Sequence, residues 1–155
     1  MIKVDGVHFS YGKQGILKGV SFDMEKGEFM CILGANGCGK TTLLKTMLGF
    51  LTPQEGSVSL YGQDVHKMDE KELAKKVAYI PQTHNPPFPF TVKDVVLMGR
   101  TPHLSRACIP SPKDLDIAGE SMARLGIERY AEKRYTELSG GQRQMVIIAR
   151  ALTQQ

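Results

Sequence analysis

One eight-residue stretch, GANGCGKT at residues 34–41, constrains the fold of this chain most strongly. It has the pattern GxxxxGK[ST], it follows the apolar run EFMCIL at residues 28–33, and it precedes a helical pattern. Glycines in such a turn let successive backbone N–H groups point inward at phosphate oxygens. The helix that follows adds the partial positive charge of its N-terminus. The sequence therefore predicts a phosphate-binding loop between a buried strand and a helix.

The side chains of this loop have separate predicted roles. Lys40 is expected to reach the β- and γ-phosphates, Thr41 to ligate Mg²⁺ through its hydroxyl, and Thr42 to reach the α- or β-phosphate. Cys38 lies near a helix N-terminus, where a thiol can become reactive, although a filler residue explains it as well. The predicted nucleotide-binding residues of the loop are Gly34, Ala35, Asn36, Gly37, Cys38, Gly39, Lys40, Thr41 and Thr42.

A second glycine-rich motif, LSGGQ at residues 138–142, opens the last predicted helix. Ser139 is a typical N-cap residue, and Gly140 and Gly141 leave the helix terminus bare. Such a terminus is a second place where backbone N–H groups can bind an anion. Taken alone, the motif also fits a simple serine-capped helix start.

Hydrophobic periodicity predicts an α/β first half followed by helices. Residues 1–33 are predicted as β-structure, in which IKVDGVHFSY and VSFDM alternate as half-buried strands do, and GSVSLYG and VAYI are further predicted strands. The alternation of strands and helices favours a parallel sheet with helices on its faces. After the proline-rich stretch at residues 85–90, caps at Thr91, Ser111 and Ser139 open helices. The predicted buried helix positions are Leu43, Leu44, Met47 and Leu48, then Leu115, Ala118, Met122 and Leu125, and last Met145, Ile148, Ala149 and Leu152.

Composition limits the class of protein. The sequence has no run of 18 apolar residues and no signal-peptide layout at its N-terminus. Its three cysteines lack CxxC spacing, which favours reduced thiols in a cytoplasm. The net charge of +4 comes from scattered Lys and Arg, so no nucleic-acid partner is expected. The four histidines show no metal-ligand spacing, so no metal other than Mg²⁺ is expected.

The order of these features is informative. The phosphate-binding loop (P-loop), a glutamine after a strand (Gln82 in YIPQ), a helical insert and LSGGQ follow one another along the whole chain. In this order they resemble the nucleotide-binding domain of an ATP-binding cassette (ABC) ATPase. The resemblance implies an α/β P-loop NTPase fold with an incomplete parallel sheet. Residues 1–86 would form the β-subdomain and part of the P-loop core, 87–140 the helical signature subdomain, and 141–155 the start of a return to the core.

The resemblance also implies how ATP is bound. Two such domains pair head to tail as a homodimer, and each ATP lies between the P-loop of one and the Ser139 helix of the other. Ser139, Gly140, Gly141 and Gln142 would then contact nucleotide. Tyr11 in FSYG matches the aromatic residue that stacks on adenine, and otherwise packs on the sheet. Gln82 matches the residue that contacts Mg²⁺ or the attacking water, and otherwise caps a turn.

A finer resemblance concerns the segment after Gln82. The segment TVKDVVLMGRTPHL, residues 91–104, is similar to the corresponding segment in importers of iron–siderophores, haem and cobalamin. This implies a cytoplasmic subunit on the inner face of the membrane, whose helical insert docks transmembrane permease subunits, and a substrate-binding protein as an indirect partner. A soluble ABC ATPase acting on ribosomes or DNA is the alternative. A P-loop kinase or GTPase is disfavoured by LSGGQ and by the lack of an NKxD-type motif.

Part of the family's catalytic set is missing from these residues. In the family, a buried strand ending in Asp and then Glu follows the LSGGQ helix, and a histidine comes later. The Glu polarises the attacking water. No run of four apolar residues followed by Asp-Glu occurs here. With Lys40 and Gln82 as the catalytic residues present, the chain is expected to bind ATP and Mg²⁺ without turnover.

Overall fold

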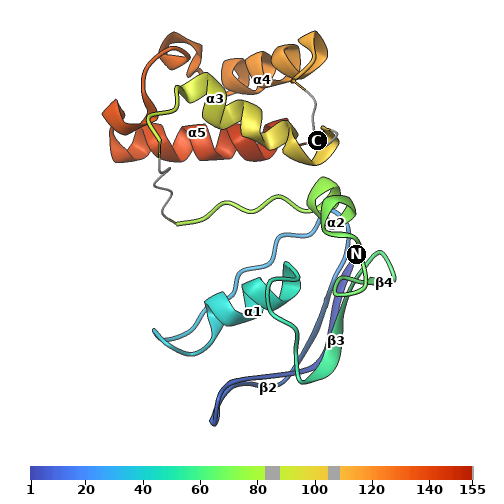
Figure 1. Ribbon diagram of the computed structural model, residues 1–155. Coiled ribbons are helices and arrows are strands. Elements are labelled where there is room, and N and C mark those ends of the chain that lie inside the picture. Colours follow the sequence, from blue (N-terminus) through green and yellow to red (C-terminus); the bar gives the residue numbers. More distant parts are fainter. Residues whose placement is uncertain (83–87, 105–108, 155) are drawn as a thin grey trace. The chain divides into compact units, whose positions relative to one another are not determined.

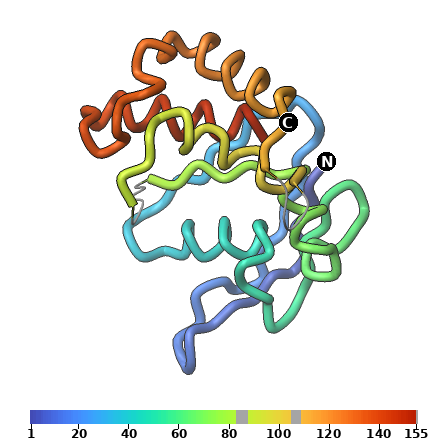
Figure 2. Tube along the Cα trace, turned by 45° about the horizontal axis from the view of Figure 1, so that its top comes forward, coloured from blue at the N-terminus to red at the C-terminus, as the bar shows by residue number. Residues whose placement is uncertain are grey.

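The structure, a computed structural model, describes residues 1–82, 88–104 and 109–154. It contains two compact units, Met1–Leu73 and Ala74–Gln155, which we call the sheet unit and the helical unit. Figure 1 labels helices α1–α5 and strands β2–β4, and Figure 2 follows the chain through each unit.

The sheet unit is built on one antiparallel sheet. Its strands are β1 (Ile2–Tyr11), β2 (Gln14–Met24), β3 (Glu55–Leu60) and β4 (Gln63–Asp64), in the order β2-β1-β3-β4. Central β1 places Val4 opposite both Phe22 of β2 and Val58 of β3. Its buried residues are Val4, Val7 and Phe9, and a register shift between Val4 and Val7 interrupts the alternation expected of a strand. The predicted N-terminal β-structure is therefore present.

Helix α1 (Lys40–Met47) follows the glycine-rich loop, as predicted. Leu48 ends it and Gly49 adopts φ +75°, the left-handed conformation typical of a residue after a helix. The buried residues are Thr42, Leu43 and Thr46, whereas Leu44 is 40% exposed. The predicted buried face was thus wrong in part. Burial of Thr46 is possible because its hydroxyl donates to the Thr42 carbonyl at 2.9 Å.

Two segments predicted as buried strands have no strand pairing within the described residues. Residues 28–33 and 77–80 are outside all strands, and Phe29 and Leu33 are 94% and 85% exposed. An apolar run becomes a parallel strand only when neighbouring strands supply the ladder. The only sheet among the described residues is the antiparallel one. These two strand predictions are therefore wrong for this structure.

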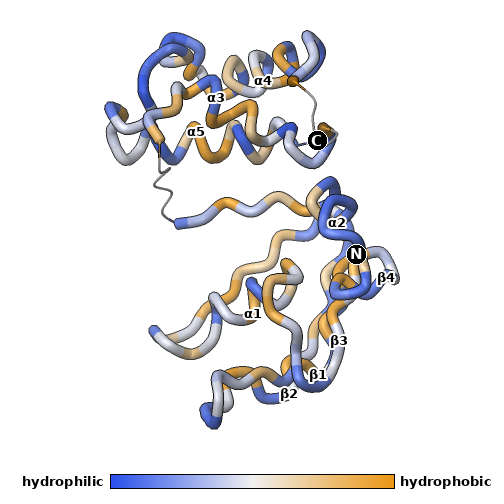
Figure 3. The backbone as a smooth tube through the Cα atoms, viewed as in Figure 1, coloured by the Kyte–Doolittle hydropathy of each residue, from blue (hydrophilic) through white to orange (hydrophobic). Residues whose placement is uncertain are grey.

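The helical unit packs three helices around one core. Its elements are the last turn of α2 (Glu70–Lys76), then α3 (Val92–Leu97), η1 (Met98–His103), α4 (Pro112–Arg124), η2 (Glu128–Tyr130), η3 (Tyr135–Glu137) and α5 (Gly140–Thr153). Figure 3 shows apolar stretches on α3 and α5 beside hydrophilic loops. The fully buried core residues are Val92, Val95, Val96, Ala118, Val146, Ile147 and Ala149.

The predicted caps of this unit are confirmed. Thr91, Ser111 and Ser139 each accept a hydrogen bond from the backbone N–H three residues on, and the side chain at that position bonds back. Asp94, Asp114 and Gln142 complete these capping boxes. The three main helices of the core therefore begin where the sequence indicates.

A buried ion pair joins η1, α4 and the end of α5. Arg100 Nε donates to Asp114 Oδ1 at 2.9 Å, and Arg100 Nη1 donates to the Thr153 carbonyl at 3.1 Å. The Ser111 hydroxyl and then Arg100 donate to the Asp114 carboxylate and lower its pKa to about 2. The helix ends are thus held together by a paired charge in the helical unit.

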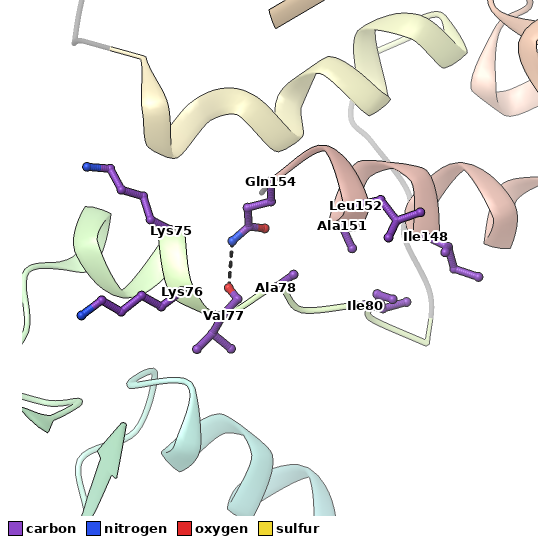
Figure 4. A pocket seen from close by; sticks show the side chains of 9 residues that line it. All are labelled: Lys75, Lys76, Val77, Ala78, Ile80, Ile148, Ala151, Leu152 and Gln154. Atoms are coloured by element: carbon purple, nitrogen blue, oxygen red, sulfur yellow. Dashed lines mark hydrogen bonds between the residues drawn. The ribbon is translucent and has the colours of Figure 1, made fainter. Parts of the chain in front are cut away.

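Helix α5 contributes one set of residues to the core and another to a separate pocket. Val146, Ile147, Ala149 and Thr153 are buried in the core, while Ile148 and Leu152 line a separate pocket of about 290 Å³ with Ile80. Figure 4 shows this pocket and the hydrogen bond from Gln154 Nε2 to the Val77 carbonyl, 2.8 Å long. Of the α5 residues predicted to be buried, Ala149 is in the core, whereas Ile148 and Leu152 lie outside it.

Candidate functional site: two glycine-rich helix N-termini

The P-loop is closed around its own lysine. Lys40 Nζ donates to the carbonyls of Gly34 and Ala35, both at 2.7 Å. The Cys38 N–H also donates to the Ala35 carbonyl at 3.3 Å, so this carbonyl accepts hydrogen bonds from both Lys40 and Cys38. Cys38 Sγ lies 3.9 Å from Lys40 Nζ. The ammonium group is therefore held inside the curl of the loop rather than extended into solvent.

Gly39 sets the junction between loop and helix. It has φ +100°, and a Cβ there would lie 2.9 Å from Ile16 Cγ2 and 3.2 Å from Leu17 Cδ2 of β2. Conformation and space both require glycine at this position. Because Gly39 is the N-cap, no side chain caps α1. The first N–H groups of α1 have no acceptor within the helix and are available to an anion.

The remaining loop residues are open to solvent. Gly34, Ala35, Asn36, Gly37 and Cys38 are all exposed, and a Cβ at Gly37 would meet no atom within 4 Å. Thr41 is exposed and Thr42 is buried. An ammonium group, uncapped N–H groups and open space together fit a phosphate chain. A hydroxyl at Thr41 adds a hard oxygen of the kind that Mg²⁺ prefers.

Tyr11 and Gln82 are both exposed. Tyr11 ends β1 in the sheet unit, with half of its surface exposed, and its ring meets that of Phe9 edge to face at a centroid distance of 5.0 Å. One part of the ring thus packs on a neighbour and the rest is accessible. Gln82 belongs to the helical unit, whereas the P-loop belongs to the sheet unit. Tyr11 and the P-loop therefore lie in the sheet unit, and Gln82 lies in the helical unit.

The LSGGQ motif forms a capped helix N-terminus. Ser139 Oγ accepts from the Gln142 N–H at 3.4 Å, and Gln142 Oε1 accepts from the Ser139 N–H at 2.9 Å. Gly140 and Gly141 are exposed, and a Cβ on either would meet nothing within 4 Å. The N-terminus of α5 is thus ordered by its cap and bare at its glycines, which fits approach by an anion.

Two hydrogen bonds at this motif were not predicted from the sequence. Gln142 Nε2 donates to Tyr130 Oη at 3.1 Å, and Arg143 Nη2 donates to the Thr136 carbonyl at 2.5 Å. Tyr130 is the last residue of η2 and Thr136 lies in η3, both in the stretch before the motif. No periodicity or motif spacing marks them, because their positions depend on how that stretch folds back onto α5.

The described residues contain no group of three or more His, Cys, Asp or Glu side chains arranged to hold a metal ion. A Mg²⁺ ion bound with nucleotide would instead take the Thr41 hydroxyl and phosphate oxygens. In the same parts of the chain, no helix is long and apolar enough to cross a membrane.

Comparison with known proteins identifies the family of this chain. A family model described as ABC transporter matches residues 17–155. The chain therefore belongs to the ABC transporter family, as its ATP-binding domain, and its fold is the mixed α/β ABC ATPase P-loop fold in part. The predicted family and the predicted mixed α/β P-loop fold are confirmed, whereas the predicted parallel sheet is not present among the described residues, whose strands all pair antiparallel.

Particular relatives refine this likeness. A "Probable iron chelatin transport ATP-binding protein" of Helicobacter pylori is 40% identical over 99% of this chain and 61% of its own length. A "Cobalamin import ATP-binding protein BtuD" of Halobacterium salinarum is 38% identical over 99% of this chain and 38% of its own. An inward-facing ABC transporter described as metal-chelate type is 33% identical, with a TM-score of 0.84, over 99% of this chain and 55% of that one. The chain spans less than two thirds of the length of each.

Proposed function

We propose that this chain is the ATP-binding part of an ABC importer subunit. The observation that carries the proposal is the P-loop with Lys40 held inside it and an uncapped helix N-terminus beside it. The capped LSGGQ helix start supports it, because the resemblance to the family implies that this element is the second wall of the ATP site. We also propose the boundaries 1–86, 87–140 and 141–155 for the three parts of the domain.

The resemblance to the family indicates a role for each residue of the proposed ATP site. Residues 34–42 bind the phosphates, with Lys40 neutralising charge on the β- and γ-phosphates and Thr41 ligating Mg²⁺. Bound Mg²⁺ would offset phosphate charge as a Lewis acid. Tyr11 stacks on adenine, and Gln82 orients the attacking water. Ser139, Gly140, Gly141 and Gln142 contact the ATP of a second copy in a head-to-tail homodimer.

We further propose that these 155 residues bind Mg·ATP without turning it over. Lys40 and Gln82 can neutralise charge and orient water, but neither is a carboxylate base. General-base assistance typically contributes about 10²–10⁴ in rate. Phosphate release by the purified chain, measured against a chain with Lys40→Ala, tests this. Turnover that depends on Lys40 would contradict it.

The transported substrate is proposed to be a metal chelate, such as an iron–siderophore, haem or cobalamin. The relatives' names and the likeness of residues 91–104 to such importers support this. Permease subunits would dock on residues 83–110, where Phe88 and Ile109 are 63% and 88% exposed. Residues 83–87 and 105–108 of that surface lie outside the described part. The subunit would sit on the cytoplasmic face of the membrane, with a substrate-binding protein as an indirect partner.

Reconstitution tests the importer proposal. A protein of the relatives' full length that contains this chain would be purified with a candidate permease and placed in vesicles. We expect ATP-dependent uptake of radiolabelled cobalamin or an iron–siderophore, lost in the Lys40→Ala variant. Co-purification with ribosomes instead of the permease would overturn the proposal in favour of a soluble ABC ATPase.

A further inference from the structure

The signature glutamine is held at both ends of its carboxamide. Gln142 Oε1 accepts from the Ser139 N–H, and Gln142 Nε2 donates to Tyr130 Oη. The Ser139 N–H can only donate, so it determines which atom of the amide faces it. The Tyr130 hydroxyl provides the second contact and prevents the amide from rotating about its last torsion. One capping bond is therefore supported by a residue twelve positions away in the sequence.

The Tyr130 ring is itself held by charge. The Arg129 guanidinium carbon lies 4.8 Å and the Lys133 ammonium 5.3 Å from the ring centroid. Both distances are within the range in which a cation is attracted to an aromatic face. Tyr130 ends η2, and the Lys133 N–H donates to its carbonyl at 2.9 Å, which closes the turn around it. The hydroxyl that meets Gln142 thus projects from a restrained ring.

We propose that Tyr130 is a positioning residue for the signature motif, acting through Gln142. Its hydroxyl keeps the Gln142 amide on the Ser139 N–H, so the capping box is satisfied internally and the Gly140 and Gly141 N–H groups stay directed at the anion. This inference rests on the proposed function, because it concerns the ATP that the signature helix of one copy contacts on the other.

The inference separates two measurable steps. Phosphate binding by the P-loop involves Lys40 and the N-terminus of α1, which belong to the sheet unit, whereas Tyr130 belongs to the helical unit. Formation of the composite site involves α5. Loss of the Tyr130 hydroxyl should therefore leave binding of one Mg·ATP unchanged while turnover falls. A change that merely destabilised the helical unit would instead lower the melting temperature and reduce the active fraction.

The experiment uses a protein of the relatives' full length that contains this chain. Tyr130→Phe keeps the ring beside its two cations and removes only the hydroxyl. We expect ATP turnover to fall about fivefold, the factor that corresponds to one neutral hydrogen bond. Mg·ATP affinity should stay within about twofold, and the melting temperature should change by less than about 2 °C. Tyr61→Phe, which removes the same group from an exposed ring of the sheet unit, is the matched control.

A double-mutant cycle tests whether Tyr130 acts through Gln142. In a Gln142→Ala background, Tyr130→Phe should change turnover by less than about 1.5-fold, because residues coupled through one contact are non-additive. An equal fivefold loss in both backgrounds, or no loss in either, would overturn the inference alone. A parent protein whose turnover is absent or independent of Lys40 would overturn the proposed function and the inference together.

Discussion

Helices α1 and α5 both begin beside exposed glycines, but they satisfy their first N–H groups in different ways. The N-cap of α1 is Gly39, which supplies no side-chain acceptor, and Lys40 folds back into the loop. The N-cap of α5 is Ser139, whose capping box with Gln142 satisfies two N–H groups internally. The first arrangement leaves the first N–H groups open and brings a cation to them, whereas the second leaves only the Gly140 and Gly141 N–H groups for a ligand.

The position of the nearest cation sharpens this difference. Lys40 Nζ lies within the curl of the P-loop, but Arg143 is turned back from the LSGGQ helix, with one bond to the Thr136 carbonyl and its charge 5.8 Å from the Tyr135 ring. A phosphate at α1 therefore meets open donors and a full charge. One at α5 meets two glycine N–H groups and a partial charge. We infer that α1 binds an anion alone, whereas α5 needs a ligand that other groups already hold.

The largest expected effect follows from that inference. Lys40→Ala should weaken Mg·ATP binding by about 2–3 kcal/mol, roughly 30- to 150-fold, because it removes charge-assisted contacts to phosphate. Calorimetric titration of the 155-residue chain measures this. Lys45→Ala, near the other end of α1, is the control and should bind as the parent does. Equal losses in both variants would mean that general positive charge, rather than the loop, holds the nucleotide.

The next largest expected effect is the loss of stability when a side chain is added at Gly39, the junction between the P-loop and α1. Gly39→Ala should destabilise the sheet unit by about 2 kcal/mol, since alanine at φ +100° is strained and its Cβ would press on Ile16 and Leu17. Urea denaturation measures the change. Gly12→Ala is matched in having a positive φ, +57°, but meets no atom within 4 Å. It should cost about 1 kcal/mol, and equal costs would show that steric contact contributes nothing.

A smaller effect is expected at the cap of α5. Ser139→Ala should cost about 1 kcal/mol of helical-unit stability, because the Gln142 N–H loses its acceptor. Hydrogen exchange of the first α5 amides would report the loss directly. Ser139→Gly should cost only a few tenths of a kcal/mol. If Ser139→Ala exchanged as the parent does, the capping box would contribute nothing to the order of this terminus.

The same contrast explains which parts of the structure the sequence could predict. Caps and glycine stops are local: Thr91 with Asp94, Ser111 with Asp114 and Ser139 with Gln142 each lie within one helical turn. The P-loop is local for the same reason, so its residues were identified without knowledge of tertiary structure. Contacts between residues close in sequence are therefore the ones that motif spacing predicts reliably.

Features that depend on distant neighbours were harder to predict. The run at residues 28–33 has the composition of a buried strand, but pairing requires a ladder from other strands. Along α5, Ile148 and Leu152 match the apolar period as well as Val146 and Ile147 do, yet only the latter pair is in the core. Tyr130 carries no signal at all, because its contact with Gln142 arises when the chain folds back.

The smallest expected effect on stability is at the second glycine of the LSGGQ motif. Gly141 lies in the first turn of α5 with no positive φ, and a Cβ there would meet nothing within 4 Å. Alanine should therefore leave the free energy of unfolding within about 0.5 kcal/mol of the parent, on the stabilising side, because it favours the helix. Urea denaturation beside Gly39→Ala gives the comparison. A cost as large as that at Gly39 would show that the fold requires Gly141. The expected result would mean that the backbone conformation does not require glycine at this position. Glycine would then serve to leave the helix terminus open to a ligand.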